Sequence, residues 1–277
     1  MPKDKKKNRK HGKTLAQRAD KYDLYQQAVQ VPEHEVEFFD RVYRKTFDRR
    51  AQVLREDFCG TFAICCDWAK SRSNRLAIGV DLDDEPLDWG RRHNLAKLKP
   101  AQQERVRLVQ ADVRAEEDVK ADIIAAENFS FWIFRTRPEL REYFAAARRN
   151  LAPEGIFVLD MMGGAESMEE DREDHTEYDG FTYVWDQARF DPITHDSSFY
   201  IHFEFDDGSA MRRAFEYHWR FWTLPEVQEL LREAGYRKID VYWEGTDSKT
   251  GEGNGVYRIR EHAENDTAWI CYVVATK

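Results

Sequence analysis

Apolar side chains follow a helical spacing in the first part of the chain. Between residues 20 and 50 they recur at steps of three and four, and Pro32 separates this stretch into two segments. A period of three to four residues places apolar side chains on one face of an α-helix, and proline favours the first turn of a new helix. Residues 20–50 are therefore predicted to form two helices.

The spacing changes at about residue 51. Short apolar runs, such as Leu76–Val80 and Ile156–Leu159, alternate with amphipathic stretches of helical length. Strands that are buried on both faces of a parallel sheet read as continuous apolar runs, and their alternation with helices predicts a doubly wound α/β fold. Together with the strands near the C-terminus, this pattern predicts a mostly parallel sheet.

A third pattern begins after the pair Gly163 and Gly164. Three segments follow, at residues 181–190, 197–205 and 211–222. They alternate apolar and polar side chains with a period of two, which is typical of strands with one buried face. We predict a three-stranded antiparallel insert at about residues 166–222, after the fifth strand of the main sheet, with residues 166–180 as an acidic loop.

Charge divides the chain into a basic start and an acidic body. The first thirteen residues, MPKDKKKNRKHGK, are mostly basic, whereas the whole chain has a formal net charge of -9. A basic segment with few apolar side chains cannot bury enough surface to fold, so residues 1–19 are predicted to be a disordered tail that either improves solubility or tethers nucleic acid. The acidic body repels phosphate and argues against nucleic acid as a partner.

The chain lacks the sequence features of membrane, secreted and zinc-binding proteins. No apolar run approaches the ~20 residues of a membrane helix, and the first segment has no apolar signal core. The four cysteines have no zinc-binding spacing and are expected to be reduced. These features predict a cytoplasmic protein with no metal site.

Acidic side chains stand at the ends of the first three strands of the predicted sheet. Glu56 and Asp57 precede the turn Cys59–Thr61, Asp81 ends the second strand and Asp112 ends the third. Ligands of doubly wound sheets bind at these strand ends. A carboxylate after the second strand can accept hydrogen bonds from ribose hydroxyls, although it can equally cap the next helix. A carboxylate after the third strand can accept a hydrogen bond from an adenine amino group.

The first turn argues against a dinucleotide. The spacing G-x-G-x-x-G, which lets the backbone approach a pyrophosphate, is absent from the turn. Carboxylates beside the turn would repel phosphate and attract a cation. The pattern therefore favours a positively charged ligand with one adenosine, which describes S-adenosylmethionine, and it disfavours a dehydrogenase.

Four motifs resemble those of the class I S-adenosylmethionine-dependent methyltransferases. They are LREDFCGTF at 54–62, IGVDLDDEPLDWGRRH at 78–93, VQADVR at 109–114 and DIIAAENFSFWIF at 122–134. More narrowly, LREDFCGT and AENFSF resemble a bacterial subgroup of this family. The first motif departs from the family pattern at Phe58 and Phe62, where glycine is usual, and at Arg55 and Asp57, where apolar residues are usual.

The resemblance implies a Rossmann-like methyltransferase domain at residues 51–277, built on a mostly parallel seven-stranded sheet, with the helices at 20–50 as a lid over the cofactor. It also implies S-adenosylmethionine as the cofactor. The implied cofactor contacts are Tyr25, Glu56, Cys59, Gly60, Thr61, Asp81, Leu82, Asp112, Val113 and Glu127.

Two regions supply candidates for acceptor binding and catalysis, namely the end of the fourth strand and the insert. The candidates are Glu127, Asn128, His202 and His218 for catalysis, and Asn128, Phe129, Tyr183, Tyr217 and Arg220 for the substrate. Each histidine can act as a base or be structural, and Arg220 suits a carboxylate or phosphate. The aromatic faces of the insert can roof an acceptor pocket, cover the core or form the contact of a homodimer.

The sequence therefore predicts methyl transfer from S-adenosylmethionine to a nitrogen or oxygen atom of a small molecule. Two alternatives remain open. One is a methyltransferase of RNA or protein that docks through the basic tail, and the other is an S-adenosylmethionine-binding protein without turnover. Fold alone does not decide among these functions.

Overall fold

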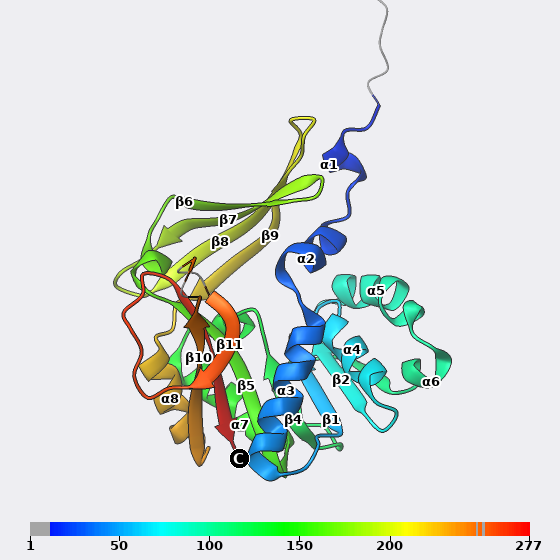
Figure 1. Ribbon diagram of the computed structural model, residues 1–277, viewed down its shortest axis with the longest axis vertical. Coiled ribbons are helices and arrows are strands. Elements are labelled where there is room, and N and C mark those ends of the chain that lie inside the picture. Colours follow the sequence, from blue (N-terminus) through cyan, green and yellow to red (C-terminus); the bar gives the residue numbers. More distant parts are fainter. Residues whose placement is uncertain (1–11, 248, 251–252) are drawn as a thin grey trace, which may run out of the picture.

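The structure, a computed structural model, describes residues 12–247, 249–250 and 253–277. Its centre is an eight-stranded sheet in the order β11-β10-β12-β5-β4-β1-β2-β3 (Figure 1). The strands are β1 (Val53–Asp57), β2 (Leu76–Asp81), β3 (Val106–Gln110), β4 (Ala121–Ala126), β5 (Leu151–Gly163), β10 (Lys238–Thr246), β11 (Gly253–Ile259) and β12 (Trp269–Thr276). Strands β1 to β5 pair with one another in parallel. Strand β12 pairs antiparallel with β5 and with β10, and β10 pairs antiparallel with β11.

Helices cover both faces of this sheet. One buried core includes Phe39 and Trp68 of α3 and α4, and the other includes Phe144 and Leu230 of α7 and α8. The helices of this part are α3 (Pro32–Phe47), α4 (Ala63–Ser71), α5 (Asp84–His93), α6 (Pro100–Gln103), α7 (Arg137–Asn150) and α8 (Leu224–Glu233), with short 3-10 turns η1 (Leu95–Lys97), η2 (Ser130–Ile133) and η3 (Ala165–Met168). The predicted doubly wound α/β fold is confirmed.

The insert after β5 is a separate antiparallel sheet. Its order is β6-β7-β8-β9, and the strands are β6 (Arg172–Tyr178), β7 (Phe181–Phe190), β8 (Asp196–Glu204) and β9 (Ala210–Arg220). Because parallel strands end at one edge of a sheet, the chain that leaves β5 through η3 starts the insert at the edge where the ligands of such folds bind. Figure 1 shows the insert above this edge.

Two details of the sheets were predicted wrongly. The insert has four strands instead of three, because β6 lies in the segment that was expected to be an acidic loop. The main sheet has eight strands instead of seven, because the glycine-rich segment forms part of β11. Both are edge strands whose side chains are mostly exposed, so the apolar alternation that marks a half-buried strand is absent.

The segment before β1 is helical, as predicted. Helix α2 (Lys21–Val29) begins at the N-cap Asp20, and α3 begins at Pro32. The predicted disordered tail is corrected in part, because residues 15–18 form the short helix α1 (Leu15–Arg18) with a capping box; residues 1–11 lie outside the described residues. None of the helices in the described ranges has both the length and the apolar character needed to cross a membrane.

Candidate active site

The first turn accommodates two phenylalanines in place of the family's glycines. Phe58, Gly60 and Phe62 have φ angles of 56°, 50° and 46°, in the left-handed region that glycine adopts most readily. Phe62 is fully buried, and a Cβ atom on Gly90 would lie 2.5 Å from its ring. The ring of Phe62 therefore uses the space that Gly90 leaves open in α5.

The space beside Gly60 is open. The ring of Phe58 packs against Phe134 and Tyr143, with ring centroids 6.1 and 5.5 Å away, and a Cβ atom on Gly60 would meet nothing within 4 Å. The phenylalanines thus join the cores on the two sides of the turn. The first turn keeps the close approach that a cofactor needs, although it has only one glycine.

Asp81 links the first turn to the second strand end. Its carboxylate accepts hydrogen bonds from the backbone N–H of Gly60 at 2.7 Å and of Asp83 at 3.0 Å. The N-cap of α5 is Asp83, not Asp81, so the alternative that Asp81 caps this helix is wrong. The next side chain, Leu82, is 71% exposed, which leaves it free to cover a bound ring.

The third strand end differs from the expected pattern. Asp112 forms a two-pronged ion pair with Arg114, with distances of 2.9 and 2.7 Å, and the hydrogen bonds from Arg114 lower the pKa of Asp112. An adenine amino group would therefore share this carboxylate with Arg114. Val113 is buried beside it, and its carbonyl accepts a hydrogen bond from Arg55.

Three of the predicted cofactor residues at the first turn are engaged with or buried in the protein, namely Glu56, Cys59 and Thr61. Glu56 accepts a hydrogen bond from the backbone N–H of Cys65 in α4 at 3.0 Å, and Cys59 is buried. Thr61 accepts a hydrogen bond at 2.7 Å from the side chain of Gln26 in α2. Helix α2 is therefore tied directly to the first turn, which is the position that a lid requires.

Four carboxyl groups from different elements interact electrostatically and form what we call the acid cluster: Glu35 of α3, Glu56 of β1, Glu127 after β4 and Asp160 of β5. Burial raises the pKa of Glu35 to about 8, of Glu56 to about 7 and of Asp160 to about 7. Burial also raises the pKa of Glu127 well above its usual range, and neither of its carboxyl oxygens has a hydrogen-bond partner among the described residues. A buried carboxylate without a partner is costly, so the cluster favours a cation.

A cavity of about 640 Å³ lies between the end of the main sheet and the insert. The predicted residues Tyr25, Asn128, Phe129, Tyr183 and Tyr217 all line it, as do Glu35 and Asp160 of the acid cluster. Its ring-bearing lining residues are Tyr25, Phe129, Tyr183, Trp185, Tyr217, Trp219, Tyr257, Trp269 and Tyr272. The structure thus brings the candidates from the lid, the fourth strand end and the insert to one place.

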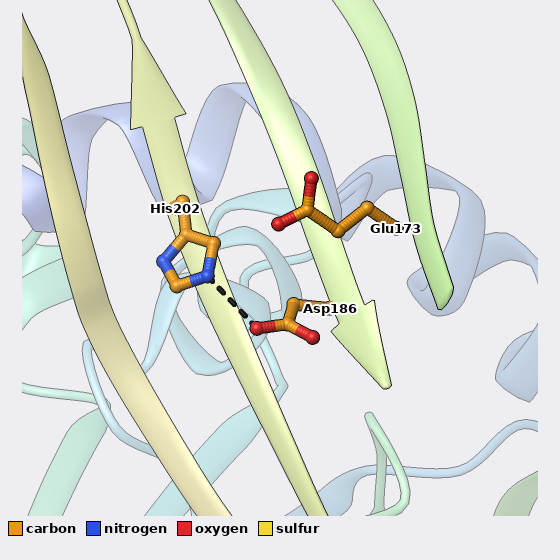
Figure 2. A group of neighbouring side chains, drawn as sticks. All are labelled: Glu173, Asp186 and His202. Carbon is orange, nitrogen blue, oxygen red and sulfur yellow. Dashed lines mark hydrogen bonds and ion pairs between the residues drawn. The ribbon is translucent and has the colours of Figure 1, made fainter. Parts of the chain in front are cut away.

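His202 lies outside this cavity and has a structural role. Its Nδ1 accepts a hydrogen bond from the backbone N–H of Arg213 at 2.7 Å, so the proton of the neutral ring is on Nε2, which donates to Asp186 at 3.1 Å. Figure 2 shows this pair beside Glu173. The three ligand atoms lie within 4.8 Å of one another, but the proton on Nε2 opposes a metal, and a role as catalytic base is not supported.

The remaining two candidates of the insert also lie away from the cavity. His218 is exposed and contacts the hydroxyl of Ser198 at 3.2 Å. The guanidinium of Arg220 stacks on Trp222 at 3.8 Å and pairs with Glu226 at 3.2 Å. Neither side chain lines the cavity in the described part of the chain, so the expectation that Arg220 holds an acceptor carboxylate or phosphate is corrected.

Several cavity residues were missed at the sequence level. Glu35 and Tyr272 come from α3 and β12, outside the four motifs, and the hydroxyl of Tyr272 donates to both oxygens of Glu35 at 2.9 and 3.0 Å. Asp160 accepts from the backbone N–H groups of Asn128 and Phe129, both at 2.8 Å. Of these three residues, only Asp160 could have been predicted from the sequence, because it is an acid at the end of the apolar run of the fifth strand.

The comparisons with known proteins agree with this geometry. Residues 57–159 match a family model described as a methyltransferase domain. Among solved structures, the chain is similar to an S-adenosylmethionine-dependent methyltransferase from Clostridium acetobutylicum ATCC 824, with 16% identity, a TM-score of 0.66, and 92% of this chain and 96% of that chain covered. A search of curated proteins found no match.

Two further similar structures are methyltransferases that act on sugars. One is CalS10 with bound S-adenosylmethionine, an amino pentose methyltransferase from Micromonospora echinaspora, at 20% identity, a TM-score of 0.65, and 96% and 99% coverage of the two chains. The other is the sugar N-methyltransferase KedS8 from Streptoalloteichus sp ATCC 53650, at 18% identity, a TM-score of 0.62, and 96% and 95% coverage. Likenesses at this identity establish the fold.

Residues 57–159 thus match the methyltransferase-domain family, and the chain has the fold of S-adenosylmethionine-dependent methyltransferases. The predicted enzyme class agrees with the matched family model, and the predicted cofactor agrees with the one bound in CalS10. The bacterial subgroup that LREDFCGT and AENFSF indicate stays a prediction, as do the roles of the individual site residues.

Proposed function

We propose that the protein transfers a methyl group from S-adenosylmethionine to a nitrogen or oxygen atom of a small molecule. The observation that carries this proposal is the acid cluster, which has no basic partner among the described residues and adjoins an aromatic cavity at the binding edge of the sheet. A sulfonium ion with an amino group supplies the positive charge that these buried carboxyl groups lack.

The residues present fit this cofactor. Asp81 would hold the ribose hydroxyls, with Leu82 and Val113 against the adenine and Gly60 leaving room for the backbone to approach. Glu56 and Glu127 would lie on the side of the positive charge. When bound, S-adenosylmethionine supplies an activated methyl group; the protein's part is to align the acceptor and to exclude water.

The insert and α2 supply the alignment and the exclusion of water. Tyr25 of α2 and Tyr217 of β9 both line the cavity, and the rings of Tyr25 and Phe215 lie 4.8 Å apart. With α2 also bonded to Thr61, the cavity is roofed by the insert and closed on one side by the lid helix. A roofed cavity of about 640 Å³ suits a small acceptor and excludes a duplex or a folded protein.

Calorimetric titration tests the cofactor assignment. We expect wild type to bind S-adenosylmethionine and S-adenosylhomocysteine, and Asp81→Ala to bind both at least about tenfold more weakly, which is about 1.4 kcal/mol. Asp88→Ala is the matched control, because Asp88 is an exposed acid of the same region that pairs only with Arg91 among the described residues. Absence of binding to wild type would refute the proposal, and equal affinity in Asp81→Ala would remove the ribose role.

The alternative acceptors are separated by a second measurement. Methyl-labelled S-adenosylmethionine is incubated with the protein and a cell extract, and the labelled products are sorted by size. Label in small molecules supports the proposal, whereas label in RNA or protein that falls with added salt or with deletion of residues 1–13 supports docking through the basic tail. The cytoplasmic location and the homodimer stay predictions, which fractionation and light scattering would test.

A further inference from the structure

The charge of the cavity lining is strongly unbalanced. Its acids are Glu35, Asp160, Glu166, Asp174 and Glu244, and its one described Lys or Arg side chain is Arg172. Arg172 is already paired with Glu166 at 2.7 Å and Asp174 at 3.1 Å. Glu35, Asp160 and Glu244 have no ion pair with a described basic residue. An acceptor with a carboxylate or phosphate would meet repulsion here, and a cation would meet attraction.

The aromatic lining adds a second preference for a cation. Nine side chains that line the cavity carry rings, and no described Lys or Arg side chain lies over any of these nine. A cation is attracted to the face of an aromatic ring, and ammonium ligands are recognised in this way. The rings also offer an apolar surface to the body of the acceptor.

Resting on the proposed function, we propose that the acceptor is a primary or secondary amine that enters this cavity as an ammonium ion and passes its proton to the carboxylate of Glu35. The ammonium nitrogen has no free electron pair until an N–H proton leaves for the Glu35 oxygen. The freed pair then forms the N–CH3 bond while the S–CH3 bond breaks and its electrons stay on sulfur. The products are a methylated ammonium ion, S-adenosylhomocysteine and protonated Glu35.

Glu35 is the acid of the cluster best placed for this role. It lines the cavity, and its hydrogen-bond partner in the described residues is the hydroxyl of Tyr272 alone. Asp160 also lines the cavity, but two backbone N–H groups stabilise its charged form. Glu127 is buried and is not among the residues that line the cavity.

Glu35 accepts a proton only in its ionised form, which the positive charges of the bound sulfonium and ammonium ions favour over the protonated form of the ligand-free protein. Its carboxyl group interacts with the hydroxyl of Tyr272 in β12 and with three acids, Asp160 of β5, Glu56 of β1 and Glu127 after β4. Its charge also acts on Tyr257 of β11. Burial and the neighbouring acids raise the pKa of Glu35, whereas the Tyr272 hydroxyl lowers it. A carboxylate with a raised pKa takes a proton from an ammonium ion more readily than an ordinary one does.

The test follows the label from 13C-methyl S-adenosylmethionine in a metabolite extract. The carbon chemical shift of each product distinguishes an N-methyl from an O-methyl group, and we expect the labelled product to be an N-methyl amine that a cation exchanger retains. Calorimetry with S-adenosylmethionine is run on the same samples. Cofactor binding with an O-methyl product refutes the amine and leaves the proposed function intact, whereas no product at all refutes both.

Two variants then test the role of Glu35 with the isolated amine. Glu35→Gln keeps an acceptor for the Tyr272 hydroxyl, and we expect kcat at pH 7 to fall by about 10²-fold or more, with recovery toward the wild-type rate at high pH, where solution supplies the free amine. Glu33→Gln is the control on the exposed side of α3 and should match wild type. If Glu35→Gln retains both the rate and the pH profile of wild type, Glu35 is not the proton acceptor.

Discussion

Arg55 and Asp57 form an ion pair inside the protein. They stand at positions of β1 where class I methyltransferases usually have apolar side chains. Their side chains are 1% and 0% exposed, and Arg55 Nε donates to Asp57 Oδ1 at 2.6 Å. The hydroxyl of Tyr143 donates to the other oxygen of Asp57 at 3.0 Å. Arg55 also donates to the carbonyls of Val113 and Ala115, so the pair fixes the loop that would contact the adenine.

Removal of the negative partner should therefore destabilise the fold strongly. Asp57→Asn keeps the shape but leaves the buried guanidinium without a countercharge, and we expect the free energy of unfolding to fall by about 3–5 kcal/mol. Urea denaturation measures this change in the free energy of unfolding. The control is Glu204→Gln, which breaks the more exposed pair with Arg212 at 2.7 Å and should cost at most about 1 kcal/mol. Similar costs for the two variants would contradict the role of the buried pair.

At the level of single residues, the sequence showed where the motif departs from the family but not how the fold compensates. Phe62 fits because Gly90 is small, and this complementarity depends on how α5 packs on the turn. Asp81 was found because a strand end can be located from an apolar run. Glu35 and Tyr272 were not found, because nothing in the local pattern of α3 or β12 shows that the two meet at the cavity.

At the scale of elements, burial decided which strands could be predicted. Strand β4 has every residue buried, and such an apolar run is recognised easily. Strand β6 has no buried residue and is rich in charge, so its conformation comes from pairing with β7 and not from local preference. The same reasoning covers the candidate site. The candidate cofactor residues lie at strand ends that the sequence predicts, whereas the candidate acceptor residues depend on how the insert is placed.

Helix α2 gives a prediction about the lid. Gln26 donates to the hydroxyl of Thr61 at 2.7 Å, and this contact holds α2 against the first turn. Gln26→Ala should weaken the binding of S-adenosylmethionine by about three- to tenfold, since a hydrogen bond of this kind contributes about 0.5–1.5 kcal/mol. Calorimetry measures the affinity. Gln27→Ala, which removes only an exposed bond to Asp23, should bind as wild type does; equal loss in both variants would mean that helix stability, and not the contact with Thr61, is responsible.

At the scale of the whole molecule, the acid cluster couples folding to pH. Glu35, Glu56 and Asp160 have pKa values raised to about 8, 7 and 7 by burial, whereas the unfolded chain has values near 4. Between these limits the folded state holds more protons than the unfolded state. The contribution of these protons to the stability of the folded state is therefore complete at low pH, and it is lost as pH rises through about 7 to 8.

We accordingly expect the free energy of unfolding of the ligand-free protein to be about 5 kcal/mol lower at pH 8.5 than at pH 6. Urea denaturation at the two pH values measures this difference. The double variant Glu35→Gln, Glu127→Gln should flatten the dependence, because it removes two of the groups that titrate, whereas Glu33→Gln should leave it unchanged. S-adenosylmethionine should stabilise wild type more at pH 8.5 than at pH 6, since its positive charge favours the ionised carboxylates. A stability that rises with pH over this interval would show that the cluster is already neutralised within the protein, and the reason for expecting a cationic cofactor there would be lost.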